Sequence, residues 1–111
     1  MQINIRNDED VIILEIAGKV DLHNAINIKN SVIQYVTGGR RKFVFSFKNV
    51  NYIDSTGIGV LLSCRTLIRS NRGQLRICGI NDSIKKIFDL TKLTAIFKTF
   101  DEEQEAVDSF K

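Results

Sequence analysis

The feature of the sequence that most constrains the fold is an apolar run that leads through a short polar joint into a helical pattern. Lys42–Phe47 carries large apolar side chains densely enough to predict a central, largely buried strand. The joint, Asn51–Leu62, brings a carboxylate, two hydroxyls and two glycines, and then opens apolar helical spacing. This order predicts a hydroxyl at a helix N-terminus, where free N–H groups and the helix dipole favour an anionic group such as a phosphate.

Outside this joint, the sequence alternates strand and helix patterns. Apolar and β-branched runs predict strands near residues 3–5, 11–17, 42–47, 74–78 and 96–100. Apolar spacings of three and four predict helices that begin near residues 22, 57, 82 and 102. The order β-β-α-β-α-β-α-β-α is typical of an α/β fold. We therefore expect one domain over residues 1–111, with a mixed, mainly parallel sheet of about five strands and about four helices.

Glycine and polar residues mark the expected ends of these elements. Gly18 is expected to end the second strand, and Asp21 to cap the helix that follows. Asn81 or Asp82 is expected to cap the third helix, and Asp101 the last one. A mainly apolar stripe predicts the buried face of the first helix: Leu22, Ile26, Lys29, Ile33 and Val36, flanked by Ala25 and Val32.

Composition and charge argue against several classes of protein. The chain is 43% hydrophobic and 26% charged, which is ordinary for a globular protein. No apolar stretch approaches the length of a membrane span, and Met1–Ile5 lacks the features of a signal peptide. We therefore expect a cytoplasmic protein with no membrane association. The net charge is +3, but the basic residues are spread over several elements without a nucleic-acid-binding motif, so direct nucleic-acid binding is not expected.

Metal and redox chemistry find little support in the sequence. Cys64 and Cys78 stand among apolar neighbours, which favours two buried, reduced thiols. The one histidine, His23, has no second ligand at zinc-site spacing and no evident catalytic partner, so we expect it on a helix surface. We expect no metal and no cofactor.

Ser55 stands at the joint, and three interpretations of it are open. Ser55 or Thr56 can cap the helix, with Asp54 adding favourable charge to its first turn. Alternatively, Ser55 is a regulatory phosphoacceptor, with nearby glycines that let a kinase approach the backbone. A small serine hydrolase is the third interpretation, but it is weak because Ile53 replaces the first glycine of the nucleophile-elbow pattern.

The helix after the joint carries a second stripe beside its core face. The core face is expected to hold Val60, Leu61, Cys64, Leu67 and Ile68. The stripe on the other side begins with two aliphatic residues and continues with two arginines: Ile58, Leu62, Arg65 and Arg69. One interpretation is a partner-binding patch. The other is that a neighbouring loop half covers the two aliphatic side chains.

Over essentially its whole length, the sequence resembles the STAS domain, the fold of bacterial anti-sigma factor antagonists. Three segments carry the resemblance: Gly18-Lys19-Val20-Asp21, Val50-x-Tyr52-Ile53-Asp54-Ser55-Thr56-Gly57-Ile58-Gly59, and Ile84-x-x-Ile87-Phe88-x-Leu90-Thr91-x-Leu93-x-x-Ile96-Phe97. The Asp-Ser-x-Gly element in this setting is the most specific of them. The resemblance implies a protein that is not an enzyme but a binding switch.

The resemblance also implies roles for individual residues and partners. An unphosphorylated antagonist binds an anti-sigma factor, usually a serine kinase with a histidine-kinase-like ATPase fold, and so releases a sigma factor. The kinase phosphorylates the serine that matches Ser55, a phosphatase reverses the step, and Thr56 is a secondary acceptor. Asp21, Asp54 and Gly57 match positions around that serine. The free protein is expected to be a monomer. The alternative is a non-catalytic STAS scaffold or adaptor in a signalling or transport complex.

Overall fold

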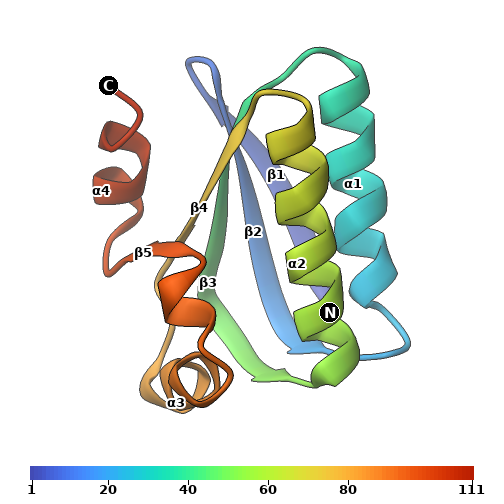
Figure 1. Cartoon of the computed structure of the whole chain (residues 1–111), viewed down its shortest axis with the longest axis vertical. Coiled ribbons are helices and arrows are strands. Elements are labelled where there is room, and N and C mark those ends of the chain that lie inside the picture. The colour runs from blue at the N-terminus through green and yellow to red at the C-terminus, as the bar shows by residue number, and fades with distance from the viewer.

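The computed structural model describes all 111 residues and shows a central β-sheet with helices packed on it (Figure 1). The elements follow one another in the order β1 (Gln2–Asp8), β2 (Val11–Val20), α1 (Ala25–Thr37), β3 (Lys42–Ile53), α2 (Ser55–Ser70), β4 (Gln74–Cys78), α3 (Asp82–Leu90), a 3₁₀ turn (Leu93–Ala95), β5 (Lys98–Phe100) and α4 (Glu103–Asp108).

The five strands lie side by side in the order β1-β2-β3-β4-β5. β1 runs antiparallel to β2, and the other three pairings are parallel. Each parallel pair is joined through a helical segment, as parallel pairing requires. The predicted fold class, a mainly parallel sheet of five strands with four α-helices, is therefore confirmed.

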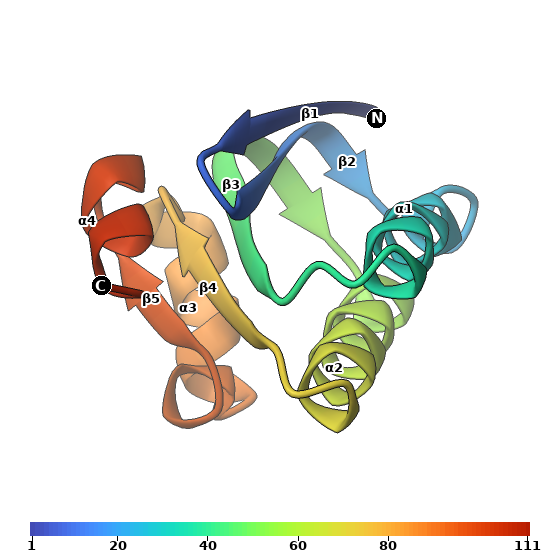
Figure 2. The same ribbon diagram turned by 90° about the horizontal axis from the view of Figure 1, so that it is seen from above.

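The helices divide unequally between the two faces of the sheet (Figure 2). α1, α2 and α3 contribute to a core of 21 buried residues on one face, whereas α4 closes a smaller core of six on the other. Because side chains alternate along a strand, Phe43, Phe45 and Phe47 of β3 face the larger core and Val44 faces α4. Burial on both faces explains why the part of β3 from Phe43 to Phe47 is apolar at every position except Ser46.

The start and the buried face of α1 differ from the prediction. The helix begins at Ala25, one turn later than expected, and Asn24 rather than Asp21 occupies its N-cap position. The buried side chains are Ala25, Ile28 and Val32, while the predicted stripe is largely on the surface, with Leu22 64%, Ile26 52% and Ile33 41% exposed. α1 carries apolar residues on two sides, and the side with Ala25, Ile28 and Val32 is the one that packs into the larger core.

Further boundaries also differ. β3 does not end at Phe47, as predicted, but continues to Ile53. β2 continues past Gly18 to Val20, because an irregular register and a left-handed φ of +93° at Gly18 bend the strand instead of ending it. β5 begins only at Lys98, after the 3₁₀ turn. Glu102, not Asp101, caps α4, through a reciprocal capping box with Glu105. Asn81 caps α3, as predicted.

No helix of the chain has the length and apolar character that crossing a bilayer requires.

Candidate functional site

The predicted strand-to-helix joint places Ser55 at the first position of α2, directly after β3. The residue that caps this helix is Asp54, whose extended backbone turns the chain and whose Oδ1 accepts a hydrogen bond from the Gly57 N–H at 2.8 Å. The prediction that Ser55 or Thr56 could cap the helix is therefore wrong. Because a neighbouring carboxylate does the capping, neither hydroxyl is needed for it.

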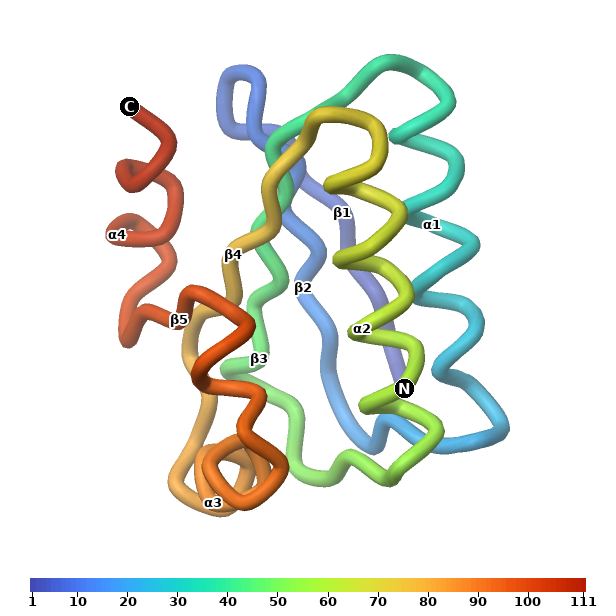
Figure 3. The backbone as a smooth tube through the Cα atoms, in the orientation of Figure 1, coloured from blue at the N-terminus to red at the C-terminus, as the bar shows by residue number.

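Asp54 also ties the joint to the loop between β2 and α1, which lies at the same end of the sheet (Figure 3). Its Oδ2 accepts a hydrogen bond from the Leu22 N–H at 3.1 Å, and its own N–H donates to the Val20 carbonyl at 3.1 Å. One side chain thus connects two loops that are 32 residues apart in sequence. This contact fixes the surroundings of Ser55.

Asp21 shapes that loop from within. Its Oδ1 accepts from the His23 N–H at 2.9 Å, while the Asp21 N–H donates to Asn24 Oδ1 at 2.9 Å. Asn24 in turn donates from its amide to the Lys19 carbonyl at 2.9 Å. The structure therefore brings Asp21 to the same end of the sheet as Ser55, with its carboxylate used for the turn and no hydrogen bond between the two residues.

Ser55 and Thr56 are both exposed, and neither hydroxyl makes a hydrogen bond within the chain. The Ser55 oxygen lies at the N-terminus of a 16-residue helix, where the dipole favours negative charge. Ser55 lines none of the hollows on the surface, and no hydrogen bond joins it to His23. The geometry suits a hydroxyl reached from outside by another protein's active site, and it does not assemble the parts of a hydrolase.

Gly57 is required by the chain's own packing. A Cβ at this position would lie 2.7 Å from Ile53 Cγ1, 3.0 Å from Val20 Cγ1 and 3.1 Å from the Val20 carbonyl oxygen. The interpretation that this glycine leaves room for an approaching kinase is therefore wrong, since the residue is buried against β2 and β3. By contrast, a Cβ at Gly59 would meet nothing within 4 Å.

The predicted stripe on α2 is only partly exposed, so neither of its two interpretations applies in full. Ile58 and Leu62 are half-buried and pack against the larger core. Arg65 is half-buried and Arg69 is exposed, and both line a groove beside β4. The expected core face is occupied by Leu61, Cys64 and Ile68, with Val60 and Leu67 at its margin.

Exposed apolar side chains near Ser55 escaped the sequence analysis. Leu22 donates a hydrogen bond from its backbone N–H to Asp54, and Ile26 lies one turn further along the chain. Tyr52, 47% exposed, is the last residue but one of β3. Periodicity predicts Leu22 and Ile26 in the core, but it does not say which side of a helix with two apolar sides is covered.

The chain presents no group of three or more His, Cys, Asp or Glu side chains that could hold a metal ion. Cys64 and Cys78 are buried and unpaired, as predicted. Burial raises the pKa of the Cys64 thiol to about 12 and that of Cys78 to about 11, so both remain protonated near neutral pH.

Comparison with known proteins gives a consistent result. The family model of the STAS domain matches residues 2–106. The chain is 27% identical over 110 residues to the anti-sigma F factor antagonist of Paenibacillus polymyxa, covering 96% of this chain and 92% of that protein. A Thermotoga maritima crystal structure, described as an anti-sigma factor antagonist, superposes with a TM-score of 0.90 at 26% identity, covering 96% and 92% of the two chains. The Bacillus cell fate determinant SpoIIAA in its phosphorylated form shares the fold, with a TM-score of 0.77 at 17% identity over 99% and 100% of the chains.

Proposed function

Because the chain belongs to the STAS domain family, we propose that it is an anti-sigma factor antagonist whose binding is switched off by phosphorylation of Ser55. Without the phosphate it binds an anti-sigma factor of the serine-kinase type and so releases a sigma factor. The kinase transfers the γ-phosphoryl group of ATP to the Ser55 hydroxyl oxygen, the hydroxyl proton leaves and ADP remains. A serine phosphatase hydrolyses the ester. The chain itself acts by binding and performs no catalysis.

The observation that carries this proposal is the free, exposed hydroxyl of Ser55 beside an aspartate that already caps the helix. A serine that served only as a cap would use its oxygen on the backbone, as Asp54 does here. The hydroxyl is thus available to a kinase without loss of a hydrogen bond that stabilises the fold. Thr56 is also exposed and is proposed as a secondary acceptor.

Phosphorylation is expected to act at the surface rather than on the fold. A phosphate adds about −1.5 to −2 charge at pH 7. The helix N-terminus stabilises this charge by about 0.3–1 kcal/mol, which offsets repulsion from the neighbouring Asp54. A partner carboxylate brought to ~4 Å would repel each unit of charge by about 1–4 kcal/mol. Since about 1.4 kcal/mol changes affinity tenfold, one such contact is enough to switch binding off.

We propose that the partner contacts the apolar side chains around Ser55. Leu22, Ile26 and Tyr52 are the exposed members, and Ile58 and Leu62 form the half-buried margin on α2. Arg65 and Arg69 extend this surface along the helix. Apolar residues at the centre with cations at the edge match the general anatomy of protein interfaces.

The proposal is tested by incubating the protein with ATP and each anti-sigma kinase of the source organism, and then measuring intact mass. We expect one added phosphoryl group in the wild-type protein and in Thr56→Val, slower and partial addition at Thr56 in Ser55→Ala, and none in the double variant Ser55→Ala, Thr56→Val. Thr56→Val is the matched control because both hydroxyls are exposed and adjacent. Kinase binding should then be measured with the phosphorylated and unphosphorylated proteins, and it should weaken at least about tenfold.

Two results would reject this function. Phosphorylation at the wild-type rate in Ser55→Ala, or any phosphorylation of Ser55→Ala, Thr56→Val, would place the switch elsewhere. A protein that no kinase modifies or binds, and that instead associates stably with a signalling or transport assembly, would be a STAS scaffold.

A further inference from the structure

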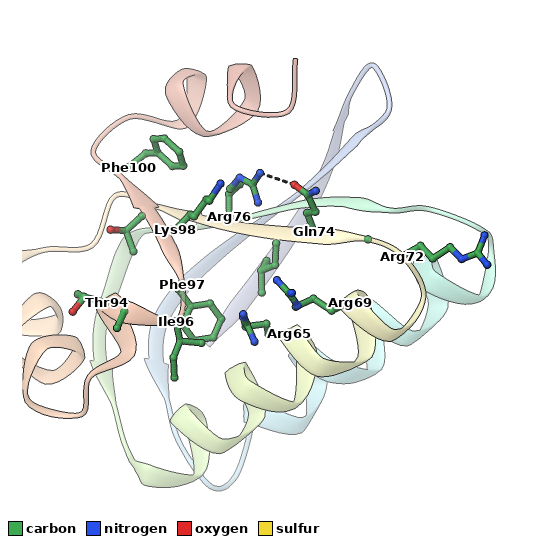
Figure 4. A pocket seen from close by; sticks show the side chains of 14 residues that line it. Arg65, Arg69, Arg72, Gln74, Arg76, Thr94, Ile96, Phe97, Lys98 and Phe100 are labelled. Atoms are coloured by element: carbon green, nitrogen blue, oxygen red, sulfur yellow. Dashed lines mark hydrogen bonds between the residues drawn. The ribbon is translucent and has the colours of Figure 1, made fainter.

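A groove of about 790 Å³ runs between α2 and the edge of the sheet at β4 and β5 (Figure 4). Five basic side chains from both walls line it, and no acidic side chain does: Arg65, Arg69, Arg72, Arg76 and Lys98. The cations come from α2, the turn after it and two strands, so only the folded chain gathers them.

None of these five cations has an acidic partner in the chain. The ion pairs of the protein are Arg6 with Glu15 and Glu103, Lys42 with Asp10, and Lys111 with Asp108. The cations of the groove are therefore uncompensated. Clustered like charges repel one another, and such a cleft concentrates anions from solution.

The lack of an acidic partner is most costly at Arg76, because this residue is only 6% exposed. Its Nε donates to Ser109 Oγ at 2.9 Å and its Nη2 to Gln74 Oε1 at 2.6 Å, while the guanidinium lies 4.6 Å from the centre of the Phe110 ring. All three partners are uncharged, and burial lowers the pKa of Arg76. Burying a charge without an opposite charge is unfavourable, so an anion bound in the groove would relieve this cost.

The spacing of the cations fits an extended acidic polypeptide. Arg65 and Arg69 are four residues apart on a helix, which separates them by about 6 Å along its axis. Alternate side chains of an extended chain recur every 6.6–6.8 Å or so. β5 pairs only with Arg76–Cys78, so the edge of β4 at Gln74 and Leu75 is not covered by a strand. Ile96, 40% exposed, adds an apolar contact on the same wall.

We infer that this groove docks an acidic, extended segment of a partner protein. The site goes beyond the switch at Ser55 and does not depend on phosphorylation there. Arg65 and Arg69 belong to both surfaces, whereas Arg72, Arg76 and Lys98 belong to the groove alone.

The test uses a fluorescent peptide of about eight residues that alternates glutamate and valine, matching the repeat of an extended chain. Fluorescence anisotropy measures its binding to the full-length chain at about 50 and 150 mM salt. The groove variant is Arg72→Glu with Lys98→Glu. The matched control is Lys85→Glu with Lys86→Glu, which changes the charge equally on the exposed side of α3.

We expect the peptide to bind the groove variant at least about tenfold more weakly than the wild type and the control variant within about twofold of it. A peptide with glutamine in place of glutamate should not bind. In the wild-type protein, NMR should show that the glutamate peptide shifts the Arg76 Nε–H resonance, a measurement that needs no variant.

Other outcomes would overturn the inference. Equal weakening in both variants would mean general attraction to a basic surface. Equal binding of the glutamine peptide would remove charge as the cause. Inorganic triphosphate or a short single-stranded DNA that binds the groove more tightly than the peptide would make the ligand a phosphate polyanion. If the glutamate peptide does not bind and the Arg76 Nε–H resonance does not shift, the groove does not dock an acidic segment. None of these results bears on whether Ser55 is phosphorylated.

Discussion

Two glycines on α2, Gly57 and Gly59, should respond in opposite directions to the same substitution. A methyl group at Gly57 would approach Ile53 Cγ1 to 2.7 Å and the Val20 carbonyl oxygen to 3.1 Å. Carbon atoms in favourable contact lie at about 3.5–4.0 Å. The Ile53 side chain would therefore have to move by roughly 1 Å, and the backbone of β2 limits how far the structure can relax. At Gly59 the methyl group enters open space.

The magnitudes follow from these contacts. Replacing an exposed helical glycine with alanine stabilises by up to about 1 kcal/mol, so we expect Gly59→Ala to gain about 0.5–1 kcal/mol this close to the helix start. Gly57→Ala gains no more than this and loses about 1–3 kcal/mol to overpacking of a filled core. Because the helix-propensity gain is similar at the two positions, the variants should differ by roughly the overpacking cost, about 1–3 kcal/mol in free energy of unfolding.

Urea unfolding followed by circular dichroism measures this difference directly. With a dependence of about 2 kcal/mol per molar urea, a difference of about 2 kcal/mol separates the two midpoints by about 1 M, with the wild type between them. A Gly57→Ala protein as stable as the wild type would refute the packing argument. A destabilised Gly59→Ala protein would refute the assignment of that position to open space.

Two further predictions concern the joint and the core. Asp54→Ala removes the acceptor for two backbone N–H groups and should destabilise by about 2 kcal/mol in urea unfolding, whereas Asp54→Asn keeps one acceptor oxygen and should lose less than half as much. Burial raises the pKa of Cys64 and Cys78, so the folded state holds these protons more tightly than the unfolded state. The stabilisation that results is fully present below about pH 9 and is lost as pH rises toward 11–12. Between pH 8 and 10 the wild type should therefore lose about 2 kcal/mol more than Cys64→Ala, Cys78→Ala.

The architecture could be predicted from the sequence because it follows from the periodicity of the apolar residues and from the order of the strands and helices. Strand and helix patterns alternate cleanly, and β3 is apolar on both faces because helices cover both. The buried side of α1 was missed for an equally physical reason. Leu22, Ile26 and Ile33 form as regular a stripe as Ala25, Ile28 and Val32, and periodicity alone does not say which of the two packs on the sheet.

In the candidate site, too, the features that depend on local order could be predicted and those that depend on contacts between distant residues could not. The position of Ser55 follows from local order along the chain. The dual role of Asp54 does not, because its second hydrogen bond reaches a residue 32 positions away. The basic groove could not be predicted for a similar reason: Arg76 and Lys98 come to line the same groove as the arginines of α2 only when β4 and β5 pair.

α2 connects the two proposed surfaces, which share Arg65 and Arg69, but it holds the phosphoacceptor Ser55 away from the groove. Ser55 opens the helix, and Arg69 lies 14 residues later, about 21 Å along the axis at 1.5 Å per residue. This separation exceeds the screening length of about 8 Å at physiological salt. Between the two ends, Leu61, Cys64 and Ile68 anchor the helix in the larger core and oppose any shift along the sheet. Phosphorylation of Ser55 should therefore weaken binding at the joint while the acidic peptide binds the groove with unchanged affinity. A peptide affinity that fell severalfold on phosphorylation would show that the surfaces are coupled through α2.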